Sequence, residues 1–258
     1  MPRLRVLVPV NGAYAGKLRV KRATGTLDID GVDRVLSDPS SQAITLARQL
    51  QVDGAELVAI HVDRGGGDEV LREALSHGVD QGILIQGTQD YEGDAAARAS
   101  LIADVYRQYG PFDVVVGPAW SEFGGFTGTL AAVAGELELP VAVGVRSIRT
   151  EGFAFRIHYA SLFGDYELQV PRPCVIIAGD LAPAYPTAWG IHDAHRSKGV
   201  IRVQADAGTL AKPLTKRLRI EGVTEERRTL EQVDGATLVR RMRSRGLIPD
   251  KNGLGAKA

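Results

Sequence analysis

"FDVVVGPAWSEFGGFTGTLAA", residues 112–132, joins a short apolar run to a helical pattern through a glycine-rich turn. The run 112–116 is typical of a buried strand, whereas the apolar residues from Leu130 to Leu137 recur at helical spacing. Glycine loses much conformational freedom on folding, so its repeated use in one turn needs a structural reason. Two interpretations stay open: backbone N–H groups that approach a phosphate, or a tight turn that lets the helix pack close to the sheet.

The same alternation of strand and helix patterns continues along the chain. Apolar runs predict buried strands at 4–10, 57–62, 82–86, 112–116, 140–145 and 174–178. They are rich in Val and Ile and almost continuous, as expected for parallel strands that are covered on both faces. Helical patterns separate the first five runs. We therefore predict an α/β fold with a mostly parallel, Rossmann-like nucleotide-binding sheet and helices on both faces.

Local signals place the ends of the predicted helices. One helix follows Asp38 as its N-cap, with Pro39 at its first position. Gly78 comes shortly after the next helix, where a left-handed residue is expected, and Gly110-Pro111 ends a third helix.

Two hairpins and a C-terminal arm are added to this pattern. Residues 17–30 and 153–170 alternate around turn residues and predict hairpins. A short helix follows the loop after residue 179, and another is predicted at 236–245. We expect a nucleotide-binding domain at 1–200 and a C-terminal arm at 201–258.

The composition excludes several classes of partner and location. The chain has 258 residues with 31 basic and 31 acidic side chains, and this balance argues against nucleic acid as the main partner. The single cysteine, Cys174, excludes an internal disulfide and fits a reducing compartment. We find no signal-peptide pattern and no apolar run of about 20 residues that could cross a bilayer. These features predict a cytoplasmic protein with no direct membrane span.

The usual catalytic and phosphate-binding motifs are absent from the sequence. The glycine-rich turn is not followed by Gly-Lys-Ser/Thr, and the spacing of Gly124, Gly125 and Gly128 differs from G-x-G-x-x-G. The second glycine cluster, "DRGGGDE" at 63–69, also follows a strand, where open α/β sheets bind ligands, but by itself it indicates a flexible connection. The histidines form no metal-ligand set, and no nucleophile and base are paired. The sequence thus predicts a nucleotide-sized site without catalytic machinery.

Several segments, in order, resemble the β subunit of electron transfer flavoproteins. They are "LRVLVPV" (4–10), "LSDPSSQAITLARQL" (36–50), "LREALSHGVDQGILI" (71–85), "FTGTLAA" (126–132) and "PAYPTAWGIHDAHRSKG" (183–199). The resemblance extends over nearly the whole chain. It implies an electron carrier subunit, not a catalyst by itself, which pairs with an α subunit. The α subunit would hold most of a shared FAD, and this chain would bind AMP or a second FAD. An acyl-CoA-type or other flavin dehydrogenase would donate the electrons.

The resemblance also implies site residues. The nucleotide site would comprise Pro9, Asp38, Pro39, Ser40, Ser41, Val62, Gly117, Pro118, Ala119, Gly124, Gly125, Phe126, Thr127 and Gly128. Tyr14 would lie near the flavin of the α subunit. The partner-docking segment would include Tyr185, Ala188 and Trp189.

Some positions depart from the family pattern. Gly125-Phe126 replaces an Asn-Gln pair, which leaves more of the phosphate contact to backbone N–H groups, and Ala188 replaces an anchoring leucine beside Trp189. A stand-alone nucleotide-binding protein of the universal-stress or nucleotide α-hydrolase type is the alternative. It explains the sheet and the glycine-rich turn, but not "LREALSHGVDQGILI" or the C-terminal arm.

Overall fold

The computed structural model describes residues 3–16, 18–21, 26–28, 31–63, 68–86, 94–121, 128–161, 163–183, 185–196, 199–204, 234–245 and 247. The chain divides into two compact units, Met1–Ile220 and Glu221–Ala258. The division at residue 200 that the sequence indicates stays a prediction. In the second unit the structure describes α6 (Gly235–Ser244), whose N-cap Asp234 accepts a hydrogen bond from Thr237 N. All other elements belong to the first unit.

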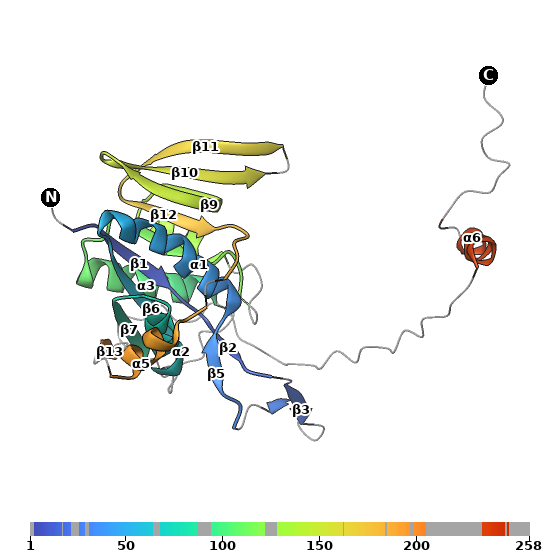
Figure 1. Ribbon diagram of the computed structural model, residues 1–258, viewed down its shortest axis with the longest axis horizontal. Coiled ribbons are helices and arrows are strands. Elements are labelled where there is room, and N and C mark those ends of the chain that lie inside the picture. The colour runs from blue at the N-terminus through green and yellow to red at the C-terminus, as the bar shows by residue number, and fades with distance from the viewer. Residues whose placement is uncertain are drawn as a thin grey trace. The chain divides into compact units, whose positions relative to one another are not determined.

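The first unit is built on a nine-stranded sheet (Figure 1). Its strands are β1 (Arg5–Pro9), β6 (Glu56–Asp63), β7 (Gln81–Gln86), β8 (Val114–Gly117), β9 (Val141–Glu151), β10 (Ala154–Ser161), β11 (Gly164–Pro171), β12 (Cys174–Ala178) and β13 (Val200–Gln204). They lie in the order β11-β10-β9-β12-β8-β1-β6-β7-β13. In this spatial order, all neighbouring strands from β9 through β12, β8, β1, β6 and β7 to β13 pair in parallel. β10 is antiparallel to both of its neighbours, β9 and β11. The predicted α/β fold with a mostly parallel sheet is confirmed.

The six predicted strands are present, but one is much longer than expected. β9 continues to Glu151, six residues beyond the predicted end at Val145. Its first part pairs with β12 and its second part with β10, and an irregularity lies near Gly144, which has φ 76°. The second part contains Arg146, Ser147 and Arg149 because one face of this hairpin region is exposed. Such a polar segment does not resemble the apolar runs that reveal buried parallel strands.

Helices cover both faces of the sheet. They are α1 (Asp38–Arg48), the 3-10 turn η1 (Gln49–Asp53), α2 (Asp68–Ser76), α3 (Ala95–Tyr109), α4 (Thr129–Glu136) and α5 (Ala188–Arg196). α1 and α2 contribute to one apolar cluster with Val6 and Val8, and α3 and α4 contribute to another with Leu7. Since successive side chains of a strand point to opposite faces, these clusters lie on opposite sides of the sheet.

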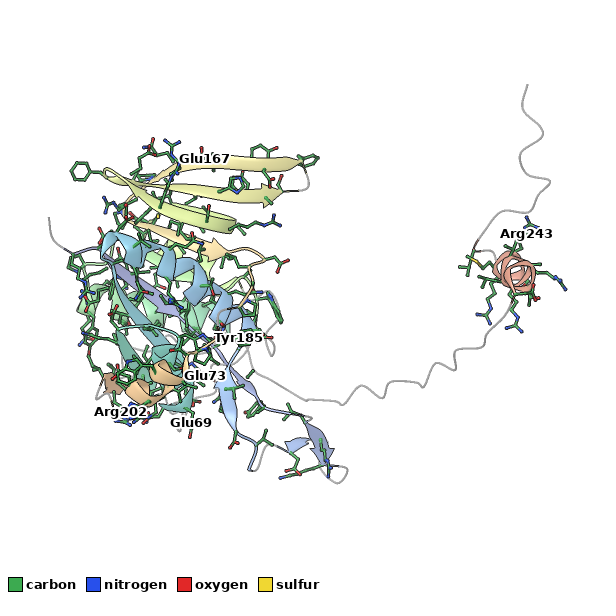
Figure 2. The ribbon with its side chains drawn as sticks, viewed as in Figure 1. Glu69, Glu73, Glu167, Tyr185, Arg202 and Arg243 are labelled. Carbon is green, nitrogen blue, oxygen red and sulfur yellow. The ribbon has the colours of Figure 1, made fainter. Side chains whose placement is uncertain are left out.

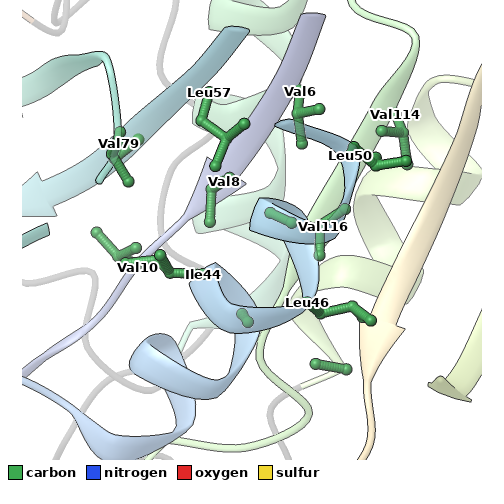
Figure 3. Close-up of a cluster of buried hydrophobic side chains, with 14 of the residues drawn as sticks. Val6, Val8, Val10, Ile44, Leu46, Leu50, Leu57, Val79, Val114 and Val116 are labelled. Carbon is green, nitrogen blue, oxygen red and sulfur yellow. The ribbon is translucent and has the colours of Figure 1, made fainter. Parts of the chain in front are cut away.

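The first apolar cluster fixes α1 across the middle of the sheet (Figure 3). Ile44, Leu46 and Leu50 are fully buried against side chains of β1 and β8 such as Val6 and Val116. Burial of a side chain of this size stabilises the fold by about 1.5–3 kcal/mol. The N-terminus of α1 is therefore held at a fixed place beside the end of β1.

The predicted N-cap of α1 is wrong by one residue. Ser37, not Asp38, is the N-cap, and its hydroxyl accepts a hydrogen bond from Ser40 N. Serine and aspartate are both good N-cap residues, so the sequence by itself does not separate the two. Pro39 therefore occupies the second helical position. Gly78, in contrast, has φ 95°, as predicted for the residue after α2.

Short antiparallel ribbons follow β1. β2 (Gly12–Tyr14) pairs with β5 (Arg34–Leu36), and between them β3 (Arg19–Lys21) pairs with β4 (Thr26–Asp28). The second pair confirms the predicted hairpin at 17–30, although its turn lies outside the described residues. The second predicted hairpin, at 153–170, is formed by β10 and β11.

Gly117 at the end of β8 allows α4 to pack closely on the sheet. A Cβ atom there would lie 2.8 Å from Leu130 Cδ1, too close for an ordinary contact. We expect Gly117→Ala to lower the free energy of unfolding by about 1–3 kcal/mol through overpacking. The effect can be measured by urea denaturation.

Gly135→Ala in α4 is the matched control, because a Cβ at Gly135 meets nothing within 4 Å. It should stabilise the helix by about 0.5–1 kcal/mol. Leu130→Ala in the Gly117→Ala background should relieve the clash. Strictly additive effects of these two substitutions would contradict the packing explanation.

Candidate functional site

The carboxyl ends of β1 and β8 meet at a switch point of the sheet. These strands are neighbours in the sheet. The chain continues from β1 to β6, toward one edge of the sheet, and from β8 to β9, toward the other edge. α1 follows β1 on one face and α4 follows β8 on the other. The departing connections leave a crevice between them, and ligands of open α/β sheets bind at such a crevice.

A small pocket lies at this switch point. Its described lining residues are Pro9, Asn11, Arg98, Ile102, Pro118, Ala119, Trp120, Gly128, Thr129, Leu130 and Ile177. Four predicted site residues, Pro9, Pro118, Ala119 and Gly128, are thus brought together, although Pro9 is over 100 positions from the other three. The pocket encloses about 40 Å³, which is room for a few water molecules, so a larger ligand would extend out of it.

Most of the pocket wall is apolar, but two features favour negative charge. The first is the guanidinium of Arg98 from α3, whose Nη2 donates to Asn11 Oδ1. The second is the N-terminus of α4, where Gly128 takes the N-cap position in the left-handed conformation (φ 65°) and supplies no side-chain cap. The N–H groups in the first turn of a helix carry partial positive charge. Apolar walls with a cation and a helix start fit a nucleotide, whose base is apolar on its faces and whose phosphate is anionic.

The open question about the glycine-rich turn is answered in part. Gly117 is explained by packing against Leu130, whereas Gly128 is explained by its left-handed backbone at the start of α4. Gly124, Gly125, Phe126 and Thr127 lie outside the described residues, and their assignment to the site stays a prediction.

The first turn of α1 positions Asn11. Ser40 is fully buried, and its Oγ accepts a hydrogen bond of 2.8 Å from Asn11 N. Ser37 N donates to Asn11 O at 3.0 Å. Ser41 is also buried, and its hydroxyl lies 3.4 Å from His77 Nδ1. The predicted residue Ser40 therefore supports the pocket edge through Asn11. Pro39 and Ser41 are buried but are not among the described lining residues, and Asp38 is exposed.

Tyr14 is the aromatic residue of β2, and Arg34 of the paired strand β5 lies over its ring at 5.4 Å. Arg34 Nη1 also donates to Asp63 Oδ1 at 2.7 Å, at the end of β6. The side chain of Asp63 is 7% exposed, so this ion pair is well shielded from water. Arg34 thus connects the ribbon that carries Tyr14 to the main sheet. The predicted residue Val62 precedes Asp63 and packs against the α3/α4 cluster.

His61 is a buried base in the same region. Its Nδ1 donates to Val10 O at 3.0 Å, and its Nε2 has no hydrogen-bond partner among the described residues. Burial is the main cause that lowers the pKa of His61 to about 4, and the Val10 carbonyl and Asp63 oppose this shift. The imidazole is therefore neutral at neutral pH.

The described part of the chain offers little support for other kinds of functional site. No group of three or more His, Cys, Asp or Glu side chains there could hold a metal ion. Cys174 is buried in β12, and this burial raises the pKa of its thiol to about 12, which keeps it protonated. No helix in the described ranges is both long enough and apolar enough to span a bilayer.

The predicted docking residues lie on or next to α5, away from the pocket. Tyr185 (labelled in Figure 2) and Trp189 are 82% and 75% exposed, and Ala188 is also exposed. The inner side of α5 packs on α2: a Cβ on Gly190 would lie 2.4 Å from Ser76 O. The helix is thus fixed to the fold while its aromatic residues face solvent.

Asn11, Arg98 and Ile177 line the pocket but were not predicted, whereas Trp120 lies within the predicted loop from Gly117 to Thr127. Asn11 closely follows a predicted strand, so a search of all residues after strand ends would have found it. Arg98 lies in a helix that begins far from β1 and β8 in sequence, and it has no such signal.

Comparison with known proteins agrees with this geometry. The family model of the electron transfer flavoprotein domain matches residues 24–207. Subunit CarD of the caffeyl-CoA reductase-Etf complex of Acetobacterium woodii is 23% identical over 196 residues, which cover 74% of this chain and 75% of that protein. Electron transfer flavoprotein β subunits of Thermoanaerobacterium thermosaccharolyticum (24% over 193 residues, 74% of each chain) and Syntrophomonas wolfei (25% over 215 residues, 82% and 84%) are similar as well.

An open α/β sheet with a pocket at its switch point places the chain in the broad class of nucleotide-binding-type folds. The family model covers well over half of the chain. The protein therefore belongs to the electron transfer flavoprotein β subunit family, and the resemblance found in the sequence is confirmed.

The buried His61 should make stability depend on pH. The pKa of His61 in the folded protein, about 4, lies below the ordinary histidine pKa of 6.5, so the unfolded chain binds the proton more readily between these values. We expect this group to lower the free energy of unfolding by up to about 3 kcal/mol as the pH falls from 6.5 to 4. Its effect is absent above pH 7.

Urea denaturation at several pH values can test this dependence against His61→Gln, which keeps an N–H donor near Val10 O but does not titrate. The variant should lose less stability than the parent protein between pH 6.5 and 4. Parallel stability curves for the two proteins would show that His61 is not the titrating group.

Proposed function

We propose that this chain is the β subunit of a heterodimeric electron transfer flavoprotein. In this proposal it pairs with an α subunit that holds most of an FAD, and it binds AMP, or a second FAD, at the switch-point pocket. The observation that carries the proposal is the family match over residues 24–207 together with a pocket that fits a nucleotide phosphate. The bound flavin would supply the redox chemistry.

The chain's own residues would position the nucleotide and the flavin contact. The apolar wall with Pro9, Ile102 and Ile177 would exclude water from one end of the nucleotide. The phosphate would lie near the start of α4, where Thr129 and the predicted residues Gly125 to Thr127 would supply N–H groups. Tyr14, supported by Arg34, would contact the flavin of the α subunit.

The C-terminal arm 201–258 would pack on the α subunit through α6. Within its own unit α6 buries none of its described side chains, and Leu238, Val239 and Met242 form an apolar stripe at helical spacing. An amphipathic helix of this kind gains stability when a partner covers its apolar stripe.

Co-expression with a flavoprotein α subunit from the same organism tests the proposal. We expect a yellow 1:1 complex, and mass spectrometry of the released small molecules should identify an adenine nucleotide. One flavin with one AMP per dimer supports AMP in this subunit, whereas two flavins support a second FAD. A chain that stays monomeric and carries a nucleotide alone would favour the stand-alone nucleotide-binding alternative, and a chain that carries none would refute the pocket assignment.

Trp189 is proposed as the residue that docks the electron-donating flavin dehydrogenase. Its indole ring is exposed and lies 5.7 Å from the His192 ring on a helix fixed to the fold. An exposed aromatic residue on a rigid element is a typical interface hot spot, with a cost of about 2 kcal/mol or more on truncation. Trp189→Ala should therefore raise the apparent KM of the dehydrogenase for the complex at least tenfold, measured by flavin reduction kinetics.

Phe153→Ala is the matched control for Trp189→Ala. Phe153 is a large aromatic residue with 90% exposure in the turn between β9 and β10, far along the sheet from α5. It should leave the KM unchanged. An equal effect of both substitutions would show that docking does not depend on α5.

A further inference from the structure

Trp120 is the one aromatic side chain among the described residues that line the switch-point pocket. It lies three residues beyond Gly117, the last residue of β8, close to the carboxyl end of the sheet. The residue is 40% exposed, although an indole ring is one of the largest apolar surfaces that a side chain can bury. The fold thus leaves part of this ring uncovered beside the pocket.

The ring of Trp120 has no aromatic or cationic partner within the described parts of the chain. Other large aromatic side chains there do have one. Tyr106 packs beside Phe112 with ring centres 5.7 Å apart, and Tyr159 is stacked on Tyr166 at 5.2 Å. A flat apolar ring that is partly exposed and unstacked can receive a planar ligand on one face.

Neighbouring residues hold Trp120 in place. Ala119 packs against the apolar cluster of α3 and α4, and Ser121 is buried. Gly117 is fixed in the sheet by its pairing with Ile177 of β12. Because the residues before and after Trp120 are held by the core, the ring is positioned before a ligand arrives. Binding at such a ring costs less side-chain and loop entropy.

The size of the pocket decides which part of a nucleotide would lie beside Trp120. The enclosed space of about 40 Å³ holds a few water molecules, and a nucleotide base is larger than that. The base therefore cannot be enclosed and must lie across the open side of the pocket. The other apolar side chains of the lining, such as Pro9, Ile102 and Ile177, are aliphatic and offer no aromatic face. Trp120 is thus the described lining residue that matches a planar base.

We propose that Trp120 stacks on the base of the bound nucleotide and makes this pocket prefer purine nucleotides over pyrimidine nucleotides and over sugar phosphates without a base. The inference rests on the proposed nucleotide site. It adds a contact to the base, whereas the N–H groups at the start of α4 would contact the phosphate. Stacking strength grows with the area of overlap, so the two fused rings of a purine gain more from an indole than the single ring of a pyrimidine does.

Titration calorimetry with AMP and CMP, and with ribose 5-phosphate as a competitor, tests the assignment. The protein is the full-length chain, purified with its α subunit and freed of nucleotide by dialysis. We expect the parent complex to bind AMP more tightly than CMP, and CMP more tightly than ribose 5-phosphate. Trp120→Leu keeps an apolar side chain without the ring. It should weaken AMP binding roughly five- to a hundredfold but leave the affinity for ribose 5-phosphate unchanged. Trp120→Phe keeps a smaller ring and should give an intermediate loss.

Phe153→Leu is the matched control, since it makes the same kind of change at an exposed aromatic residue that does not line the pocket. It should change none of the three affinities. Tryptophan fluorescence gives a second readout, because Trp120 and Trp189 are the two tryptophans of the chain. AMP should quench part of the emission of the parent complex, whereas ribose 5-phosphate should not. Trp120→Leu should remove the quenching by AMP.

The possible results separate the two proposals. If Trp120→Leu binds AMP as tightly as the parent complex, or loses affinity for AMP and ribose 5-phosphate by the same factor, Trp120 does not stack on the base and the inference is overturned. Equal affinities of the parent complex for AMP and CMP would overturn the purine preference. In both cases the nucleotide site itself would still stand. If the parent complex binds neither AMP nor FAD, the proposed nucleotide site fails first, and the role of Trp120 fails with it.

Discussion

The crevice between β1 and β8 follows from one constraint: parallel strands that are buried on both faces need helices above and below them. Val6 and Val8 of β1 face the layer of α1, while Leu7 between them faces the layer of α3 and α4. The connections that supply these layers leave β1 and β8 in opposite directions. The strand ends between them are left without a covering helix, and exposed backbone and the start of α4 remain there for a ligand.

Packing contacts on both sides of the pocket fix the positions of its walls. α1 is fixed by its apolar residues, its first turn fixes the backbone of Asn11, and Asn11 in turn aims Arg98. On the other side, the close contact of Gly117 with Leu130 sets how near α4 lies to the sheet. The geometry of the pocket thus depends on the packing of the core, and substitutions in the core are expected to change that geometry. The same holds for α5, whose exposed Trp189 is presented by a helix that packs closely on α2.

The family relationship and the geometry answer different questions. Similarity over residues 24–207 establishes the family, and identities of 23–25% to curated relatives leave the details of the site to this chain's own residues. Here the departures matter. Where the family pattern has an Asn-Gln pair this chain has Gly125-Phe126, and an arginine from α3 lies in the pocket that those residues are predicted to border.

Local sequence patterns are enough to predict most of the elements, because periodicity, caps and glycine positions act over a few neighbouring residues. They predicted the six apolar strands, the order of helices, both hairpins and the glycine turn at the switch point. They missed the polar half of β9 and the edge strand β13, since exposed or edge strands lack a continuous apolar run. Which side chains come into contact depends instead on the long-range packing of the sheet and helices. Asn11 and Arg98 are 87 positions apart, and Arg34 and Asp63 are 29 apart, so no local pattern links them. Their contacts exist because the sheet order places β1 beside β6 and β8 and α3 beneath them, and this order depends on the packing of the whole domain.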